Sequence, residues 1–480
     1  MSYGSVVAIY AHADRHAIIA ILAIASRGIC FVGLDVNYPD KLITHILTTA
    51  GIDAVMVDRA NAASPLLTAQ PELPLIPIDG YLQVTNWQPL PPDKAINADT
   101  LMYKVYTSGS TGLPKELAAR HSLMLNIIQW QNGIGLDKPA RTLQFTSLSF
   151  DISHQEICTS LCTGGTLLLR PPAFRRDHQA LLRFIQTERV ERLYIPYIDI
   201  VLQSLAETAQ ALKMAPDCLC EIVSAGEMLF CTEAIKDLFR KSPGSRLINM
   251  YGTSETHVVT SYTLQGEHDN WPTAVPVGYP ADNCGVYIVD ETNQLLADQQ
   301  QIGQIAIIGM HVWHSYQNNP SANQQKFCQL SLNGQHQLAY LTGDIGHYDN
   351  QGRLNYLERR DYQVKINGYR VECGQLETLL LESGYFHSVA VTVQQEKLVA
   401  YLRLKSADTR VSTTELYQRL QQCLPAGALK MEFRVVDALS TTPSGKIDRA
   451  GLAGLSWYPL PDDNLSAQPI INGKQQISAR

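Results

Sequence analysis

Residues 106–115 read Tyr106-Thr107-Ser108-Gly109-Ser110-Thr111-Gly112-Leu113-Pro114-Lys115, after a strand-like apolar run and before a helical pattern over residues 117–128. Hydroxyl groups, backbone N–H groups freed by glycine and one lysine are the groups that hold a polyphosphate. The segment is not a Walker loop, because the GxxxxGK[ST] spacing is absent. A surface turn rich in serine and glycine is the alternative. The preceding strand and the terminal Pro-Lys favour phosphate binding.

Apolar runs alternate with helix-length segments over the first 360 residues. This rhythm is typical of βαβ units that build buried, mostly parallel sheets. We therefore predict an α/β fold with a large N-terminal domain over residues 1–360, in which mixed or parallel sheets are flanked by helices. The predicted strands are 5–11, 29–34, 53–58, 100–107, 165–170, 192–196, 221–224 and 246–250.

The pattern changes after Thr342 to short strands joined by turns. A smaller, mobile α+β domain is predicted over residues 361–452. Its strands are expected at 388–393, 398–404 and 431–436, and its helix at 412–423. Residues 453–480 are rich in proline, aspartate, asparagine and glutamine without apolar periodicity, so we expect a loosely held tail.

The composition is that of a globular protein, with 45% hydrophobic and 17% charged residues and a net charge of −7, and it does not indicate a basic surface for nucleic acid. Ten cysteines without a CxxC pair exclude a disulfide framework and a zinc site. The apolar run 17–25 is far short of the ~20 residues that span a membrane. Asp14 lies before it, where a signal peptide would be positive. We expect a buried helix there, in a cytoplasmic protein without a membrane partner.

Five further segments follow the first one in the order found in one family. Together the six span residues 106 to 449, and the ordered set is far more specific than any single segment. By this set the chain resembles the ANL superfamily of adenylate-forming enzymes, and within it the amino-acid adenylation domains of nonribosomal peptide synthetases. The five segments are Phe150–Ser153, Asn249–Glu255, Thr342–Asp344, Arg359–Arg370 and Pro443–Arg449.

The resemblance implies ATP and Mg²⁺ as cofactors. Tyr251 would stack on adenine, while Asp344 and Arg359 would hold the ribose. Glu255 matches the magnesium ligand, and a hard carboxylate oxygen suits Mg²⁺. Taken singly, Tyr251 could equally be a core tyrosine, Asp344 part of a turn, and Glu255 an acid near the start of a helix. The remaining implied ATP contacts are Thr107, Ser108, Gly109, Ser110, Thr111, Gly112, Lys115, Gly226, Glu227, Asn249, Gly252 and Ser254.

Two further residues belong to the small domain and its junction. Lys446 matches the lysine that the family brings to the reacting carboxylate and phosphate, a transient role that suits a flexible ammonium. Outside this motif it would be a solvated surface charge. Asp361 aligns with the family's hinge, about which the small domain swings between adenylate formation and thioester formation.

Asp151 matches the aspartate that pairs with the substrate α-amino group in amino-acid-activating members, and a helix N-cap is the alternative role. The implied pocket is otherwise neutral and mostly aliphatic, which disfavours acidic and basic amino acids. It resembles the pockets of proline-activating members, with pipecolate and valine as alternatives. Its lining would be Asp151, Ile152, Gln155, Tyr194, Val223, Ala225, Met250, Val258 and Val259, closed by Lys446.

The chain also departs from the family pattern. The family's large domain begins some tens of residues earlier, so we expect a shortened N-terminus. Glu116 and Glu358 stand where glycine is usual, Thr253-Ser254 replaces Pro-Thr, and Leu341 replaces an arginine. Glu116 is expected to add negative charge near the polyphosphate and to weaken ATP binding.

No carrier, condensation or thioesterase motif is visible in the sequence. We therefore expect a stand-alone enzyme that activates an amino acid and loads the phosphopantetheine thiol of a carrier protein in trans. The alternatives are an acyl- or aryl-CoA ligase of the same superfamily and a catalytically impaired nucleotide-binding protein.

Overall fold

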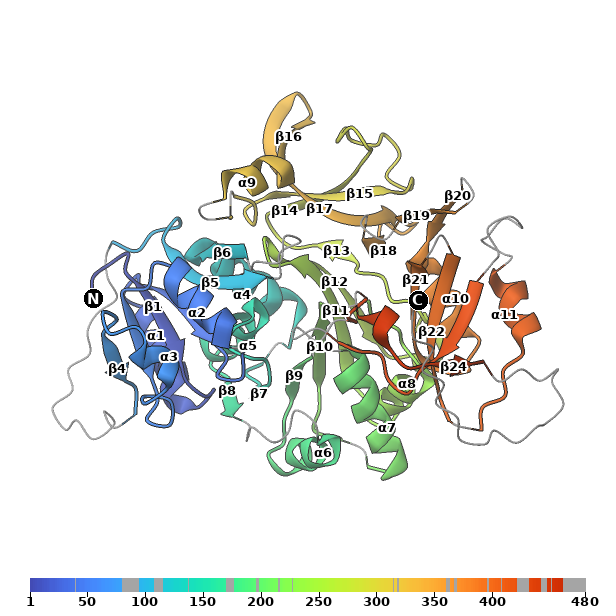
Figure 1. Ribbon diagram of the computed structural model, residues 1–480, viewed down its shortest axis with the longest axis horizontal. Helices are drawn as coiled ribbons and strands as arrows, with labels where there is room; N and C mark the ends of the chain where they lie inside the picture. Colours follow the sequence, from blue (N-terminus) through green and yellow to red (C-terminus); the bar gives the residue numbers. More distant parts are fainter. Residues whose placement is uncertain are drawn as a thin grey trace, which may run out of the picture.

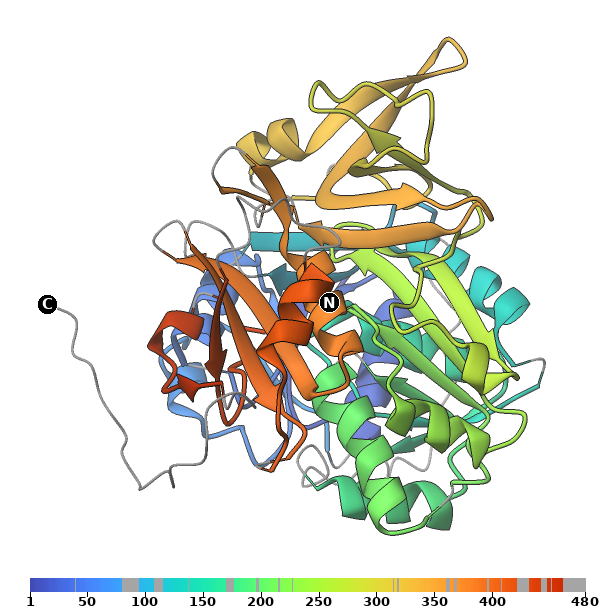
Figure 2. The same ribbon diagram turned by 90° about the vertical axis from the view of Figure 1, so that its right-hand side faces the viewer.

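The computed structural model shows sheets flanked by helices, with a smaller unit at the C-terminal side (Figures 1 and 2). Its described strands form five sheets of six, seven, five, two and four strands. The residues that it describes are 1–460 without 39, 80–94, 108–114, 137, 170–176, 196–197, 215, 227, 314, 317–318, 360–362, 367–368, 395–396, 407, 421–430, 442–446 and 450.

The first sheet confirms the strands predicted up to residue 107. Its neighbours are parallel except β5 and β6, which form an antiparallel pair. The carboxylate of Asp14 caps α1 by accepting from the N–H groups of His16 and Ala17. The run 17–25 is a helix, as predicted, but it is buried on one face only, because Ile19 and Leu22 are exposed. The strand order is β4 (Leu75–Pro77), β3 (Ala54–Val57), β1 (Val6–Tyr10), β2 (Cys30–Leu34), β5 (Leu101–Thr107) and β6 (Lys115–Arg120). The helices are α1 (Arg15–Ala25), α2 (Asp40–Thr49) and α3 (Pro65–Thr68).

The segment after the glycine-rich stretch differs from its prediction. Residues 115–120 form strand β6, and helix α4 (His121–Ile134) begins only at His121. The helical pattern expected from Leu117 was therefore wrong at its start. Leu117, Ala118 and Ala119 are buried in the pair with β5, and this long-range pairing overrides their local preference for helix.

The second sheet has two differently covered faces. Leu193, Ile222 and Leu247 belong to a core with α6, α7 and α8, while Tyr194, Val223 and Ile248 belong to a core with α4 and α5. Strands β7 to β11 run parallel, and β12 and β13 are antiparallel. The strand order is β13 (Tyr279–Pro280), β12 (His257–Gln265), β11 (Arg246–Thr253), β10 (Glu221–Ala225), β9 (Arg192–Ile195), β7 (Arg141–Gln144) and β8 (Thr166–Leu169). The helices are α5 (Asp151–Cys162), α6 (His178–Thr187), α7 (Ser204–Ala211) and α8 (Glu233–Arg240).

A buried carboxylate fixes the register of the three central strands. Glu221 is wholly buried and lies directly opposite Arg192 on β9 and Arg246 on β11. Each arginine donates from Nε to one of its oxygens, at 2.6 Å and 2.9 Å. A slip of one residue would turn this carboxylate to the opposite face, away from both partners.

The third sheet is antiparallel and follows the second in the chain, at the top of Figure 1. It contains β14 (Cys284–Val289), β15 (Gly303–Gly309), β16 (Phe327–Leu332), β17 (Gln335–Tyr348) and β18 (Leu354–Arg359), with α9 (Pro320–Lys326) before β16. The C-terminal unit contains β19 (Gln363–Ile366), β20 (Tyr369–Glu372), α10 (Cys373–Glu382), β21 (Phe386–Gln394), β22 (Lys397–Leu404), α11 (Thr413–Leu420), β23 (Met431–Val435) and β24 (Tyr458–Pro459).

The C-terminal sheet extends further than expected. Tyr458 and Pro459 pair with Val435 and Arg434 of β23, and the Arg434 guanidinium lies 4.8 Å from the ring centroid of Trp457. The prediction of a loose tail from Ala453 was therefore wrong up to Pro459, because strand pairing and a cation–π contact hold this segment. Residues 461–480 lie outside the described part of the chain.

The small unit contacts the second sheet's helices. His387 on β21 has its Nδ1 2.9 Å from Oε1 of Glu207 on α7, and the Gln203 amide donates to the same oxygen at 2.6 Å. Figure 2 shows the small unit in front of the large one. This contact joins the two regions that the sequence assigned to separate domains.

Glu116 carries a charge that the fold compensates. Its Oε1 lies 2.8 Å from Nζ of Lys104, which also donates to the Ala50 carbonyl at 2.8 Å. Its Oε2 accepts from the Tyr106 hydroxyl at 2.9 Å. Both charged residues are 8% exposed. The negative charge expected near the polyphosphate is thus paired within the β5–β6 hairpin.

Removing one member of this pair should be far worse than removing both. Lys104→Met or Glu116→Leu leaves a buried charge alone, and we expect each to cost about 3–5 kcal/mol, with the double variant recovering most of that loss. Urea unfolding of all three variants measures the coupling. If the double variant lost as much unfolding free energy as the two single variants together, the pairing would be contradicted.

Candidate active site

The carboxyl ends of the central strands of the second sheet gather the predicted pocket residues. In register, Val223 lies beside Tyr194, and Ala225 lies beside Met250. Because β9, β10 and β11 are parallel, their carboxyl ends share one edge, where open α/β sheets bind ligands. Antiparallel β12 returns Val258 and Val259 to the same edge.

Seven of the predicted pocket residues belong to a single buried apolar cluster. None of them is more than 8% exposed. A charged substrate side chain placed there would lose its hydration without gaining a partner from these groups. The seven are Ile152, Tyr194, Val223, Ala225, Met250, Val258 and Val259.

Buried polar groups from α4 and α5 meet at this cluster. Gln155 donates from Nε2 to Oε1 of Gln131 at 2.7 Å and to the sulfur of Met250 at 3.5 Å. The Tyr194 hydroxyl contacts Thr159 Oγ1 at 2.8 Å and accepts from the Gln131 amide. Burial raises the pKa of Tyr194 to about 12, so the hydroxyl stays protonated. Within the described residues, Oε1 of Gln155 has no hydrogen-bond partner.

Sequence reasoning missed Gln131 and Thr159. Gln131 lies 24 residues before Gln155 on another helix, and their contact comes from the packing of α4 on α5. No motif marks either residue, so the sequence offered no signal for them.

Asp151 is the first residue of α5, and the N-cap is Phe150. The alternative role of Asp151 as N-cap was therefore wrong. Its Oδ1 accepts from the N–H of Ile152 at 2.8 Å, and a negative charge in the first turn is favoured by the helix dipole. The side chain is half-buried, and its chain neighbours Phe150 and Ile152 pack in the apolar cluster.

The turn between β11 and β12 depends on Gly252. A Cβ there would lie 1.8 Å from the carbonyl oxygen of His257, so only glycine fits. His257 itself has φ +56°, a left-handed conformation that is uncommon for a side-chain-bearing residue. This close approach brings Ser254 and Glu255 into the turn between Tyr251 and the start of β12.

The predicted nucleoside residues lie together. The Tyr251 hydroxyl donates to Oδ2 of Asp344 at 2.7 Å. Burial, and then the Asp344 charge, raise the pKa of Tyr251 well above its usual value, which keeps the hydroxyl a donor. Asp344 on β17 lies directly opposite Arg359 on β18. Asn249 instead donates to the backbone carbonyls of Val275 and Pro276.

Several predicted residues lie outside the described part of the chain. They are Ser108, Gly109, Ser110, Thr111, Gly112, Glu227, Asp361 and Lys446, together with the side chains of Thr107 and Arg359. At the edges of these gaps, Gly226 has φ +92° directly after β10, and Nζ of Lys115 lies 5.7 Å from the ring centroid of Tyr316.

Glu255 suits Mg²⁺ by its chemistry. It offers a half-buried carboxylate, one oxygen of which accepts from the Tyr316 hydroxyl. Over the described ranges, no group of three or more histidine, cysteine, aspartate or glutamate side chains could hold a metal ion. A magnesium ion here would therefore share its coordination with phosphate oxygens, as Mg²⁺ commonly does.

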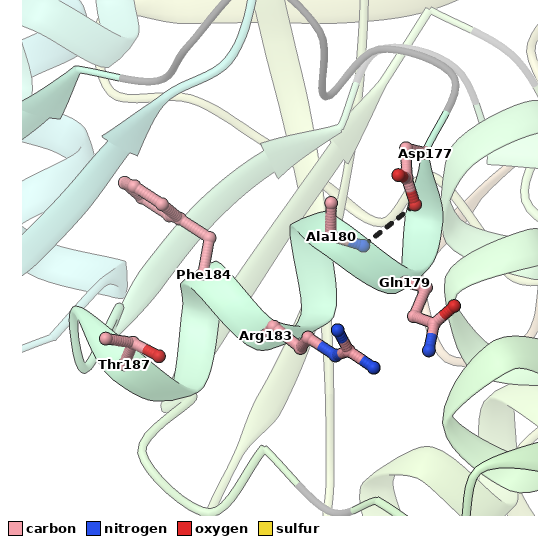
Figure 3. A pocket seen from close by; sticks show the side chains of 6 residues that line it. All are labelled: Asp177, Gln179, Ala180, Arg183, Phe184 and Thr187. Atoms are coloured by element: carbon pink, nitrogen blue, oxygen red, sulfur yellow. Dashed lines mark hydrogen bonds between the residues drawn. The ribbon is translucent and has the colours of Figure 1, made fainter.

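A surface pocket on α6 contains none of these residues. It is lined by Asp177, Gln179, Ala180, Arg183, Phe184 and Thr187 (Figure 3). Oδ1 of Asp177 accepts from the N–H of Ala180 at 2.9 Å, which is an ordinary N-cap. The pocket belongs to the outer face of the helix and not to the candidate site.

Among the helices that the structure describes, none is long and apolar enough to cross a membrane.

Residues 1–317 match the family model described as "AMP-binding enzyme". The chain belongs to this family, which confirms the resemblance to the ANL superfamily. It is an adenylate-forming enzyme, and its family implies AMP-forming ligase chemistry with ATP as substrate.

The chain is 31% identical to tyrocidine synthase 2 of Brevibacillus parabrevis, over 94% of the chain but only 12% of that protein. It is 30% identical to gramicidin S synthase 2 of Brevibacillus brevis, over 94% of the chain and 10% of that protein. It thus spans only about a tenth of the length of these relatives.

Among solved structures the chain resembles Klebsiella oxytoca NpsA in complex with 3-hydroxyanthranilyl-AMSN, with a TM-score of 0.78 and 22% identity over 95% of this chain and 89% of that one. NpsA is also known in a fusion with ThdA, described as an artificially fused adenylation–PCP di-domain, with a TM-score of 0.65 and 22% identity over 90% and 84% of the two chains.

O-succinylbenzoate coenzyme A synthetase (MenE) of Bacillus subtilis, in complex with AMP, matches with a TM-score of 0.74 and 22% identity over 94% and 89% of the two chains. At this identity the structural matches show the fold alone, and they confirm the predicted α/β architecture.

Three buried histidines, His154, His257 and His311, should make the fold acid-sensitive. Burial, and then the nearby His257, lower the pKa of His154 to about 3 and of His311 to about 4. The unfolded chain binds these protons below about pH 6.5, whereas the folded chain does not. Stability should therefore fall as the pH drops from 6.5 toward 4, by up to about 1.4 kcal/mol per pH unit for each such group.

Thermal unfolding at pH 7.5 and 5.0 measures this effect. His154→Asn should reduce the pH-dependent loss relative to the unsubstituted protein, while the same change at exposed His336 should not. An identical pH dependence in both variants would count against the role of His154.

Proposed function

We propose that the protein activates a compact apolar amino acid, with L-proline as the best candidate, and transfers it to the phosphopantetheine thiol of a carrier protein. One observation carries the proposal: Asp151 is the one carboxylate among the proposed lining residues, and its chain neighbour Ile152 belongs to the neutral and buried pocket cluster. Such a carboxylate can pair with an ammonium group, including the secondary ammonium of proline, while the aliphatic surface takes the ring.

The polar groups of the pocket support an apolar side chain. The hydroxyl of Tyr194 is already bonded to Gln131 and Thr159, so it does not require a donor or acceptor from the substrate. The one buried oxygen without a partner among the described pocket residues is Oε1 of Gln155. A compact apolar side chain brings no polar group that would be left without a partner in this pocket.

The proposed reaction has two halves. In the first, the substrate carboxylate attacks the α-phosphorus of ATP, and the aminoacyl-AMP forms as pyrophosphate leaves. In the second, the carrier thiol, having lost its proton, attacks the acyl carbon, and a thioester forms as AMP leaves. Both halves need the same acyl carbon to face different partners, which is why a domain movement is required.

The residues divide these tasks by chemistry. Tyr251, Asp344 and Arg359 would hold the nucleoside, and the segment 107–115 would hold the phosphates. Mg²⁺, when bound, would neutralise phosphate charge, and Glu255 is its proposed ligand. Lys446 would stabilise the negative charge that develops during attack on phosphorus, and Asp361 would serve as the hinge between domains proposed over 1–360 and 361–452.

A CoA ligase of the same superfamily is the alternative. The fold does not separate the two, because MenE matches it about as well as NpsA does. Asp151 favours the amino-acid substrate, since an acid without an amine would leave this carboxylate without an ammonium partner. A catalytically impaired nucleotide-binding protein is the third possibility, and measurement of activity distinguishes it.

Amino-acid-dependent ATP–pyrophosphate exchange with a panel of substrates tests the proposal. L-Proline should give the highest rate, ahead of leucine, phenylalanine and benzoate, and coenzyme A should be a poor acceptor. Asp151→Asn should lower exchange with proline at least about tenfold by removing the ammonium partner. A preference for a carboxylic acid without an amine would move the protein to the CoA ligase class.

Lys446→Ala should lower the exchange rate by orders of magnitude while the protein stays folded, because it removes the ammonium group proposed to stabilise the transition state. Lys397→Ala, at an exposed lysine of the same small unit, is the matched control and should exchange normally. Near-normal exchange in folded Lys446→Ala would remove this lysine from the site.

A further inference from the structure

Tyr316 joins parts of the candidate site that come from different sheets. It lies between β15 and α9 and is 4% exposed. Its backbone forms a bridge with Leu117 of β6, and Asn323 of α9 bonds to both its N–H and its carbonyl, at 3.3 Å and 2.9 Å. The side chain therefore projects from a backbone that is held on both sides.

The two ends of this side chain meet two candidate ATP-binding residues. The hydroxyl donates to Oε1 of Glu255, in the β11–β12 turn of the second sheet. The ring lies 5.7 Å from Nζ of Lys115, at the start of β6 in the first sheet. A protonated lysine at this distance is attracted to the face of an aromatic ring.

These contacts have a geometric consequence. A phenol that donates to one carboxylate oxygen fixes the direction of the other, which is the oxygen a metal ion would use. The ring restrains the lysine at the end of the segment proposed to hold the phosphates. One side chain thereby sets the separation between a metal ligand and a phosphate-binding ammonium.

We propose that Tyr316 is a positioning residue that orients the Glu255 carboxylate for Mg²⁺ and places Lys115 for the polyphosphate. The inference rests on the proposed function in one respect: Glu255 and Lys115 must contact Mg²⁺·ATP. It adds a residue that none of the sequence motifs marked, because Tyr316 acts through two other side chains.

Tyr316→Phe tests the hydroxyl. ATP binding is measured by calorimetry at increasing Mg²⁺, without amino acid, so that the readout is independent of catalysis. We call the Mg²⁺ concentration that gives half of the maximal increase in ATP affinity the Mg²⁺ midpoint. It should rise roughly tenfold, as expected for loss of a hydrogen bond to a charged group. ATP binding in EDTA should not change, because the ring beside Lys115 remains.

Tyr316→Leu tests the ring. It should raise the Mg²⁺ midpoint as Tyr316→Phe does, and it should also weaken ATP binding in EDTA. The matched control is Tyr348→Phe, which removes a hydroxyl that donates to the Val286 carbonyl, a group outside the candidate site, at 2.9 Å. This control should leave both readouts unchanged.

A double variant ties the effect to Glu255. In a Glu255→Gln background, adding Tyr316→Phe should shift the Mg²⁺ midpoint no further. Should Tyr316→Phe fail to fold, Glu255→Asp tests the same link, because the shorter side chain leaves the reach of the hydroxyl. It should then raise the Mg²⁺ midpoint by a similar factor.

The outcomes separate this inference from the proposed function. A Mg²⁺ midpoint in Tyr316→Phe equal to that of Tyr348→Phe would overturn the positioning role while leaving amino-acid activation intact. Unaltered protein that binds ATP equally with and without Mg²⁺ would overturn the metal assignment and this inference together. Mg²⁺-dependent ATP binding that Tyr316→Phe weakens supports the inference even where no amino acid is activated in the exchange panel.

Discussion

The bonds from Arg192 and Arg246 to the buried Glu221 carboxylate set the register on which the candidate site depends. They lie near the amino ends of three parallel strands. Because register is transmitted along each strand, fixing one end also fixes which side chains stand level at the other. Tyr194, Val223 and Ala225 reach the pocket together for this reason.

The second constraint is the close backbone approach at Gly252. It lets β11 turn back into β12, so that residues assigned to three different tasks lie on one hairpin. Tyr251 precedes the turn, Glu255 lies within it and Val258 follows it. The left-handed conformation of His257 is consistent with strain held at a functional site by the surrounding core.

One departure from the family pattern, Glu116, is compensated by partners within the fold. Glu116 would place an unmatched charge beside the phosphate segment if it stood alone, but Lys104 and Tyr106 take both of its oxygens. The pairing explains how an acidic residue can occupy a position where glycine is usual. Its cost falls on stability, through desolvation of two charges, more than on the electrostatics of the nucleotide site.

The sequence by itself determined the strands and the site motifs, because apolar runs and short motifs are local patterns. Strands β1, β2, β5 and β10 follow from it, and the family resemblance of its motifs assigns Tyr251 and Asp344 to one nucleotide site. Only the tertiary structure decided that residues 115–120 form a strand, that Gln131 meets Gln155, and that Tyr316 reaches Glu255. These depend on contacts between segments distant in the chain, whose free energies no local pattern encodes.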